Sequence, residues 1–386
     1  MSRTPDEHAA AVRDLLGALP AETVGLADAA RRRARLAAAV VAREDQPRFD
    51  NSQMDGYATS LLGERAAVAG PTVPAGSDPD ALYPHGLGGA AAPVMTGAML
   101  PAGTRAVVPV ETCAPDSFVA EGEPVHLPAA GAGQFVRPAG SDIRAGDTLA
   151  PAGAEITPAL FGALVAQGLE EVKVRRRARI LLVTGGAEVS GTGAAAIRDT
   201  NGPMLEVLAH RHGIGVAGRV ATDDDPAALR GALERAIGET RPDAVVTSGG
   251  ISHGRFEVVR QVLADGWYGH VAQQPGGPQG LSHLGDVPVI SLPGNPVSTL
   301  VSFRLYVAPF LGHAPDPLLA PLAAEITGLE GRDQFLRGRV GAGGSVEAVG
   351  KPGSHLLAQA GPATCLIRIP AGTTVPAGSL ARVYPL

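Results

Sequence analysis

The sequence predicts a multidomain α/β protein built around a doubly wound, mainly parallel sheet. Three observations support this fold class. Residues 176–312 alternate apolar strand patterns with helical patterns, as in a parallel sheet covered by helices. Residues 46–137 and 317–386 carry short apolar runs between glycines and prolines, which is typical of β-rich modules. The length of 386 residues suggests two to four such parts.

Residues 5–45 are predicted to be mainly helical. Apolar residues recur at helical spacing until Pro20, which breaks the helix. A second helix is expected over Ala29–Arg43, with Asp28 as its N-cap. After the β-rich segment, residues 138–175 begin with a turn rich in glycine and proline. They continue as a helix over Thr157–Gln167.

Strands and helices are expected to alternate through the α/β region. The strands are apolar runs that end in small residues, and Asp225 is a plausible N-cap for one helix. The strands are expected at Arg179–Thr184, Gly215–Val220, Asp243–Thr247 and Val287–Leu292, and the helices at Pro203–His212, Pro226–Ile237, Arg255–Leu263 and Pro296–Phe310. Because sheets of this kind bind ligands at the carboxyl edge of their strands, we expect the site there. The last segment, residues 317–386, is expected to form a small barrel or sandwich.

Composition argues against several classes of function. The net charge is −6 and aromatic residues make up 4%, so neither a nucleic-acid partner nor a base-stacking platform is expected. Cys113 and Cys365 lie outside any metal-binding spacing and are expected to be reduced and buried. The N-terminus lacks the layout of a signal peptide, and no apolar run is long enough to span a bilayer. We therefore expect a cytoplasmic protein with no membrane partner.

Small residues at two strand ends form candidate binding loops. Ser248-Gly249-Gly250 would let a ligand approach backbone N–H groups. In Leu292-Pro293-Gly294-Asn295-Pro296, the asparagine suits a helix N-cap and the second proline suits the first helical position. The start of such a helix can bind an anion. An ordinary tight turn between strand and helix is the alternative interpretation of either loop.

Several carboxylates lie in polar loops, where they are natural Mg²⁺ ligands when phosphates are present. They are Asp55, Asp142, Glu188, Asp199, Asp224, Asp225 and Glu257. Spacing alone does not separate metal ligands from solvated surface charges or turn caps, and the latter roles are the more common.

Several segments, in order along the chain, resemble the molybdenum insertase family, which includes bacterial MoeA and the C-terminal domain of gephyrin. The resemblance covers nearly the whole chain. Its segments are Asn51–Ala58, Thr96–Gly103, Arg137–Ile143, Asp199–Asn201, Ser248–Gly250, Leu292–Pro296 and Gly353–Leu357.

The resemblance implies a molybdopterin molybdotransferase that inserts molybdate into adenylylated molybdopterin, with Mg²⁺, and releases AMP and molybdenum cofactor. It also implies a homodimer that handles small-molecule substrates and works with other proteins of molybdenum cofactor biosynthesis. The implied subdomains are an elongated part with an inserted β-rich part, an α/β molybdopterin-binding domain and a C-terminal β-barrel: residues 1–45 with 138–175, 46–137, 176–312 and 317–386.

The same resemblance implies two sets of site residues. The expected catalytic residues are Asp55, Thr96, Asp142, Glu188 and Glu257, and the four acids among them are expected to hold Mg²⁺. The first three would come from the neighbouring subunit. The residues expected to bind the pterin and phosphates are Ser248, Gly249, Gly250, Ser252, Arg255, Pro293, Gly294, Asn295 and Pro296.

The chain departs from the family pattern in three places. Ala187 stands where the family has an aspartate, next to Glu188. In the segment Ser252–Glu257, Arg255 stands where the family has an acidic residue. Gln274 and Gly277 stand where the family has two lysines. Our hypothesis is that Arg255 partly replaces the lost positive charge. The departures leave two alternatives open: an impaired paralogue that binds molybdopterin or pairs with an active insertase, and an enzyme that uses another oxyanion such as tungstate.

Overall fold

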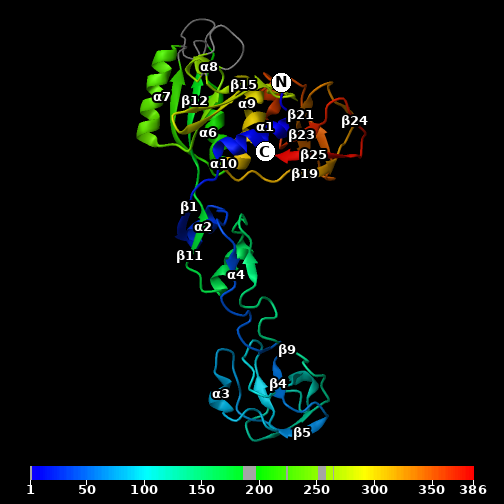
Figure 1. Ribbon diagram of the computed structural model, residues 1–386. Coiled ribbons are helices and arrows are strands. Elements are labelled where there is room, and N and C mark those ends of the chain that lie inside the picture. Colours follow the sequence, from blue (N-terminus) through cyan, green and yellow to red (C-terminus); the bar gives the residue numbers. More distant parts are fainter. Residues whose placement is uncertain (1, 186–196, 223–224, 251–257, 264) are drawn as a thin grey trace. The chain divides into compact units, whose positions relative to one another are not determined.

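The computed structural model describes residues 2–185, 197–222, 225–250, 258–263 and 265–386 (Figure 1). The chain divides into two compact units, which are Met1–Pro20 with Arg176–Leu386, and Ala21–Arg175. Residues 1–20, which the sequence analysis grouped with 21–45 and 138–175, lie in the first unit. The division into four subdomains stays a prediction.

A six-stranded sheet forms the centre of the first unit. Its strand order is β13 (Gly215–Thr222), β12 (Arg179–Gly185), β14 (Ala244–Ser248), β18 (Val287–Leu292), β17 (Pro278–Leu284) and β15 (Trp267–His270). The first four strands are parallel, and β17 and β15 are added antiparallel. The predicted mainly parallel sheet is confirmed, and its four predicted strands match the observed ones to within two residues. The two antiparallel strands were not predicted.

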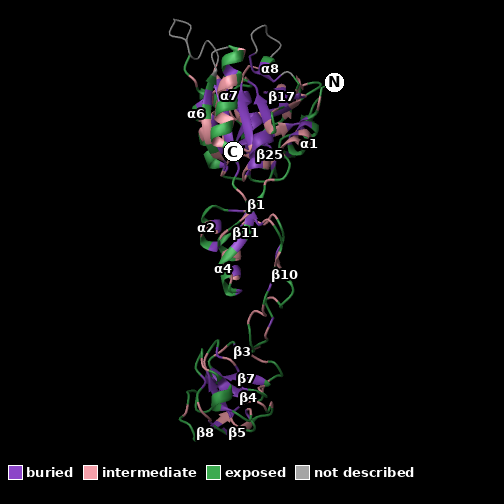
Figure 2. Cartoon of the chain, turned by 60° about the vertical axis from the view of Figure 1, so that its left-hand side comes forward, coloured by how far each residue is buried: buried purple, intermediate pink, exposed green. Residues whose placement is uncertain are grey.

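Helices cover both faces of this sheet. They are α6 (Asn201–Arg211) and α9 (Pro296–Ser302) on one face, and α7 (Pro226–Thr240) and α8 (Val258–Val262) on the other. Successive strand side chains point to opposite faces, so Leu182 packs in the first layer and Leu181 and Val183 in the second. In Figure 2 the strands are buried between helices whose outer faces are exposed. The predicted helix Arg255–Leu263 lies partly outside the described residues.

Local signals correctly placed several helix ends. The Asp225 side chain caps α7 by accepting bonds from the N–H groups of Ala227 and Ala228. Thr157 caps α4 (Pro158–Ala166) through the N–H of Leu160. After α9 the chain continues through a π-helical turn and a last short helix, Phe303–Val307 and α10 (Ala308–Leu311).

The C-terminal residues form a second sheet in the same unit. Its strands, in order, are β16 (Gln273–Gln274), β21 (Asp333–Val340), β23 (Cys365–Ile369), β25 (Leu380–Pro385) and β19 (Leu318–Pro321), with β22 (Val346–Ala348) beside β21. The strands β20 (Ile326–Thr327) and β24 (Thr374–Val375) form a separate pair, and Ala358–Ala360 is a single 3₁₀ turn. Among the described residues the expected barrel closes only through one bridge, between Leu322 and Val346, and not through a continuous ladder.

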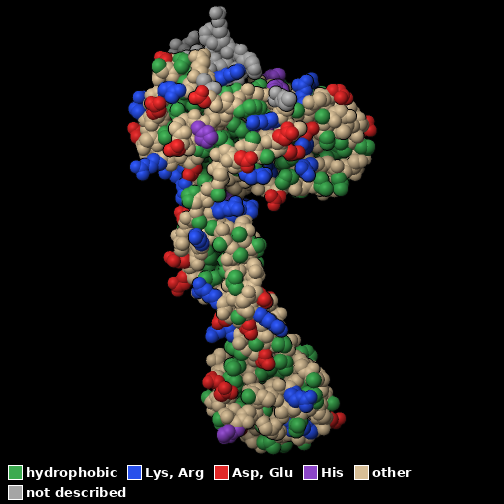
Figure 3. Space-filling view, viewed as in Figure 1, with side chains coloured by type: hydrophobic (Ala, Val, Ile, Leu, Met, Phe, Trp, Pro, Cys, Tyr) green, Lys and Arg blue, Asp and Glu red, His purple; other side chains and the backbone are tan. Residues whose placement is uncertain are grey.

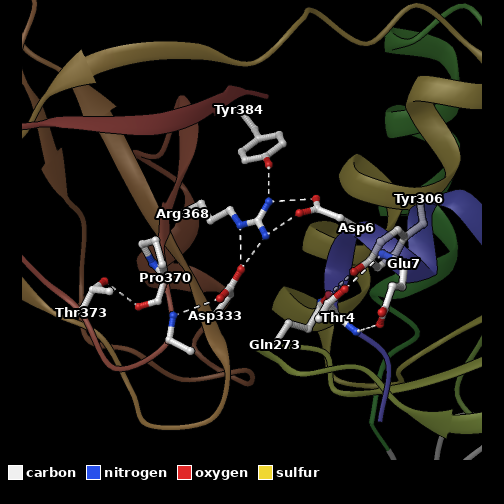
Figure 4. Close-up of polar contacts among 11 residues, drawn as sticks. Thr4, Asp6, Glu7, Gln273, Tyr306, Asp333, Arg368, Pro370, Thr373 and Tyr384 are labelled. Atoms are coloured by element: carbon white, nitrogen blue, oxygen red, sulfur yellow. Dashed lines mark hydrogen bonds and ion pairs between the residues drawn. The ribbon is translucent and has the colours of Figure 1, made fainter. Parts of the chain in front are cut away.

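The N-terminal helix α1 (Pro5–Leu16) joins this unit through its core and through an ion-pair cluster. Thr4 and Glu7 form a capping box at its start, and Val12 is fully buried in the core beside the sheet. Arg368 of β23 lies between Asp6 of α1 and Asp333 of β21 (Figure 4). The guanidinium group therefore joins the N-terminal helix to the C-terminal sheet.

The second unit contains short elements around separate cores. One core includes β1 (Ala21–Gly25), α2 (Leu26–Arg31), β2 (Val40–Val41), β10 (Thr148–Ala150), α4 and β11 (Glu171–Arg175). Two further cores lie among the remaining elements. These elements are β3 (Asn51–Ser52), β4 (Gly56–Thr59), β5 (Arg65–Val68), α3 (Pro79–Leu82), β6 (Ala92–Val94), β7 (Ala106–Pro109), a 3₁₀ turn Val110–Thr112, β8 (Pro124–Leu127) and β9 (Val136–Arg137). The predicted β-rich texture of residues 46–137 is thus confirmed.

The predicted helix over Ala29–Arg43 is wrong. The helix α2 ends at Arg31, its N-cap is Gly25, and Asp28 lies in its first turn. Arg33 adopts a left-handed conformation with φ 53°, which stops helical hydrogen bonding. Beyond it, Leu36 is fully buried and bridges to β11, so tertiary pairing overrides the high helix propensity of alanine and arginine.

Three further findings concern the cysteines, the apolar helices and the surface charge. Cys113 and Cys365 are free and buried, as predicted. Within the described ranges, no helix has both the length and the apolar character needed to cross a membrane. On the face shown in Figure 3, basic and acidic side chains are interspersed.

The Arg368 cluster predicts unequal effects of its two acids on stability. Asp333 and Arg368 side chains are each 14% exposed, whereas Asp6 is 71% exposed. Removing a shielded partner leaves a charge unpaired, so Asp333→Ala should lower the free energy of unfolding by about 3 kcal/mol. Asp6→Ala should cost less than about 1 kcal/mol. Urea unfolding followed by the fluorescence of Trp267, the chain's single tryptophan, measures both. Equal losses would contradict this account.

Candidate functional site

Two backbone turns follow neighbouring parallel strands at one end of the α/β sheet. Gly249 and Gly250, after β14, have φ of +92° and +69°, which glycine adopts without strain. The N–H of Gly249 donates to the carbonyl of Leu292 at 3.0 Å. A Cβ on Gly294 would lie 3.2 Å from the Cα of Gly249. The absence of side chains thus lets the two turns approach closely.

The side chain of Asn201, at the start of α6, joins these turns. Its Nδ2 donates to Ser248 Oγ at 3.0 Å and to the carbonyl of Gly294 at 2.6 Å. Ser248 Oγ also lies 3.0 Å from Thr299 Oγ1, which donates to the carbonyl of Pro293 at 2.6 Å. Asn201 Oδ1 is buried without a hydrogen-bond partner in the described part of the chain. This oxygen can accept a bond from a ligand.

Asp199 has a structural role in the arrangement shown here. Its Oδ2 accepts bonds from Thr184 Oγ1 and from the Arg219 guanidinium, each at 2.9 Å, and its Oδ1 accepts the N–H of Gly202 at 2.9 Å. Both carboxylate oxygens are therefore already bonded. They fix the start of α6, and with it Asn201, against the end of β12.

The turns open into a cavity of about 750 Å³ within the first unit. Its walls come from the strand ends, the loop of residues 273–278, the strand β21 and the C-terminal segment 348–354. Its described lining includes three arginines, which are Arg198, Arg332 and Arg337. The one carboxylate among its described lining residues is Asp199, which is paired with Arg219. The described wall is therefore positively charged and suits an anionic ligand.

Buried polar side chains hold the cavity walls in place. Arg337 is 4% exposed, and its guanidinium donates to the carbonyls of Lys351 and Leu356. Burial lowers the pKa of this guanidinium from its ordinary value. The carbonyl of Ser354 accepts the N–H of Val297 at 3.0 Å, which attaches the same segment to α9. The C-terminal segment is thus fixed over the cavity.

A second buried network supports the loop of residues 273–278. Gln273 accepts a bond from the Tyr306 hydroxyl and donates to the carbonyl of Pro275 at 2.9 Å. Gln279 donates to the carbonyl of Gly276 at 2.8 Å and to Ser302 Oγ at 2.7 Å. Two buried amide side chains therefore hold the carbonyls of Pro275 and Gly276, and the loop itself lines the cavity.

Most residues expected to bind the pterin and phosphates line this cavity. They are Ser248, Gly249, Gly250, Pro293, Gly294, Asn295 and Pro296. Asn295 is the N-cap of α9, but its side chain makes no capping bond, and Pro296 occupies the first turn. Ser252 and Arg255 lie outside the described residues, so their predicted roles stay predictions.

Asp55 and Thr96 lie together in the second unit. Asp55 Oδ1 accepts bonds from the backbone N–H of Thr96 at 2.6 Å and from its hydroxyl at 2.8 Å. These two bonds, the backbone one foremost, hold the pKa of Asp55 below its ordinary value. Both side chains belong to exposed residues. The pair thus presents an ionised carboxylate to solvent.

The other expected acids are not gathered by the described structure. Asp142 is exposed in a turn, where its N–H donates to the carbonyl of Gln46 at 2.9 Å. Glu188 and Glu257 lie outside the described residues. In the portion of the chain that the structure describes, no group of three or more metal-binding side chains lies close enough to hold a metal ion. The predicted Mg²⁺ site stays a prediction.

Three residues that shape the cavity were not predicted as site residues from the sequence, namely Asn201, Arg332 and Arg337. Asn201 belongs to a family-like segment, and its position two residues after Asp199 was the available signal. Arg332 and Arg337 carry no local signal, because they reach the cavity only through packing of the C-terminal sheet.

Three family models together match most of the chain. Residues 3–168 match the MoeA N-terminal region (domains I and II), residues 180–313 a probable molybdopterin-binding domain, and residues 319–386 the MoeA C-terminal region (domain IV). Molybdopterin molybdenumtransferase 2 of Mycobacterium tuberculosis is 35% identical, with 100% of both chains covered. Molybdopterin molybdenumtransferase of Haemophilus influenzae is 31% identical, with 83% of each covered.

The fold is likewise shared with a solved structure. The crystal structure of a molybdopterin biosynthesis MoeA protein from Pyrococcus horikoshii superposes with a TM-score of 0.81 at 22% identity, and the match covers 100% of each chain. Together, the matched domains and the full-length relatives show that the chain belongs to the MoeA family of molybdopterin molybdenumtransferases.

Proposed function

We propose that this protein is a molybdopterin molybdenumtransferase, which cleaves adenylylated molybdopterin, releases AMP and yields molybdenum cofactor from molybdate. The observation that carries the proposal is the positively charged cavity at the carboxyl edge of the sheet, with glycine turns on its floor. Both substrates are anions, and the relatives are named as enzymes that transfer molybdenum to molybdopterin. The comparisons offer nothing in favour of an impaired paralogue.

The cavity supplies the contacts that such a substrate needs. The backbone N–H groups of Gly250 and Gly294 would donate to phosphate oxygens, because no side chain at these glycines blocks the approach. The unpartnered Oδ1 of Asn201 would accept an N–H of the substrate. Arg332 would neutralise phosphate or molybdate charge, since the one carboxylate in the described wall, Asp199, is paired with Arg219.

The acids of the second unit form the other half of the proposal. Asp55, ordered by Thr96, and Asp142 would act with Glu188 and Glu257 of the other subunit in a homodimer. Mg²⁺ held by these four acids would neutralise charge on the phosphates that are cleaved. The described residues do not by themselves form a magnesium site. We also propose a cytoplasmic location, where Cys113 and Cys365 would stay reduced, and work beside other proteins of molybdenum cofactor biosynthesis.

The first experiment follows AMP released from adenylylated molybdopterin by the purified protein with Mg²⁺. Release should require molybdate. Asn201→Ala removes the bonds that set both turns, so kcat/KM should fall about tenfold or more. The control is Asp286→Asn, at an exposed residue outside the cavity lining. No release by the wild-type protein, or the same rate in Asn201→Ala, would contradict the proposal.

The Asp55–Thr96 pair predicts a shift in the pH dependence of the same reaction. An ionised Asp55 is required, so activity is present above its pKa and is lost as the pH falls through it. Thr96→Ala removes the hydroxyl bond and should raise the pKa of Asp55 toward its ordinary value. The acidic limb of the kcat/KM profile should therefore move to higher pH. An unmoved limb would show that Asp55 does not act as the ionised group.

A further inference from the structure

His270 and Gly277 share one space at the cavity wall. His270 ends β15 and pairs with Pro278 of β17, so its side chain lies beside the loop that precedes that strand. A Cβ built on Gly277 would lie 2.4 Å from both Nε2 and Cε1 of the imidazole. Both residues line the cavity. The ring thus fills the volume that any side chain at position 277 would take.

The backbone of His270 is anchored, although its side chain is exposed. Its carbonyl accepts bonds from the N–H of Arg3 at 3.1 Å and from Ser2 Oγ at 2.8 Å. The guanidinium of Arg3 stacks on the Trp267 ring at 3.8 Å, which fixes this N-terminal segment along β15. The anchoring limits where the imidazole can move.

The ring is free to contact a ligand. Its nitrogens have no hydrogen-bond partner among the described residues, and His270 is exposed at the cavity wall. An imidazole always carries at least one N–H donor, and two when it is charged. An exposed histidine usually faces solvent only. The overlap with the space above Gly277 distinguishes this one, because the missing side chain there leaves the ring beside the cavity.

We propose that His270 is a substrate-contacting residue whose imidazole donates a hydrogen bond to a tetrahedral oxyanion, either the phosphate of the nucleotide or molybdate. Gly277 is the residue that makes room for it. This inference rests on the proposed function, since it takes its ligands from that reaction. It adds a polar contact to the cavity at the end of β15, on the wall formed by the loop of residues 273–278.

The test measures binding of sodium molybdate and of AMP, separately, by isothermal titration calorimetry. His270→Ala should weaken at least one of the two by about fivefold or more, from the loss of one hydrogen bond to a charged group. Gly277→Ala should do the same, because its methyl group displaces the ring. The Gly277 backbone is outside the left-handed region, so alanine adds no backbone strain there, and the atoms nearest its methyl group are those of the His270 ring. His283→Ala, at an exposed residue of β17 outside the cavity lining, is the matched control.

An arginine at position 270 tests whether a hydrogen-bond donor is what the ligand needs. The His270→Arg variant should bind the affected probe at least as well as the wild type. Weakened molybdate alone would identify molybdate as the ligand, and weakened AMP alone would identify the phosphate. Unchanged binding of both probes in His270→Ala, or a wild-type protein that binds neither, would overturn the inference. If the wild-type protein releases AMP but His270→Ala binds both probes as tightly as the wild type, only this inference is contradicted. Binding that depends on His270, without AMP release, contradicts the proposed function only.

Discussion

The pair of hydrogen bonds from Asn201 Nδ2 to Ser248 and Gly294 holds the ends of β14 and β18 together. The geometry of the cavity floor depends on this contact. Gly249 and Gly294 let the two turns approach each other closely. The hydroxyl of Thr299, in the adjacent helix α9, donates to the carbonyl of Pro293. Because these groups are buried, losing one bond would leave others unpaired, and the floor would lose its shape. One amide side chain therefore fixes two turns and leaves its own oxygen for a ligand.

The upper wall of the cavity comes from a distant part of the chain. The C-terminal sheet brings Arg332 and Arg337 opposite the strand ends, and the buried guanidinium of Arg337 fixes the segment that ends near Ser354. Arg368 then joins that sheet to the N-terminal helix. Arg368 thus joins segments far apart in sequence, Arg337 fixes a nearby segment of the C-terminal sheet, and Arg332 is the arginine that we propose binds the anion. The described wall is cationic, although the whole chain carries a net charge of −6, because its arginines face a single carboxylate that is already paired.

The fold class and the parallel strands could be predicted from the sequence because apolar runs and caps such as Asp225 are local signals. The antiparallel strands β15 and β17 could not, since Trp267–His270 and Pro278–Leu284 contain glycine and polar residues that pair only in context. The helix expected at Ala29–Arg43 does not form, because burying Leu36 in the extended chain stabilises the fold more than the helix propensity of this segment would. The binding turns were predicted from glycine, proline and asparagine. His270, Arg332 and Arg337 were not, because long-range packing brings them to the cavity.

The central claim is that the cavity of the α/β unit binds adenylylated molybdopterin across the two turns fixed by Asn201. A crystal structure of the protein with this compound, grown without molybdate, tests it most directly. The account predicts phosphate oxygens on the N–H groups of Gly250 and Gly294, with a substrate donor on Asn201 Oδ1. Density for the compound at another place, with this cavity holding only solvent, would contradict the account.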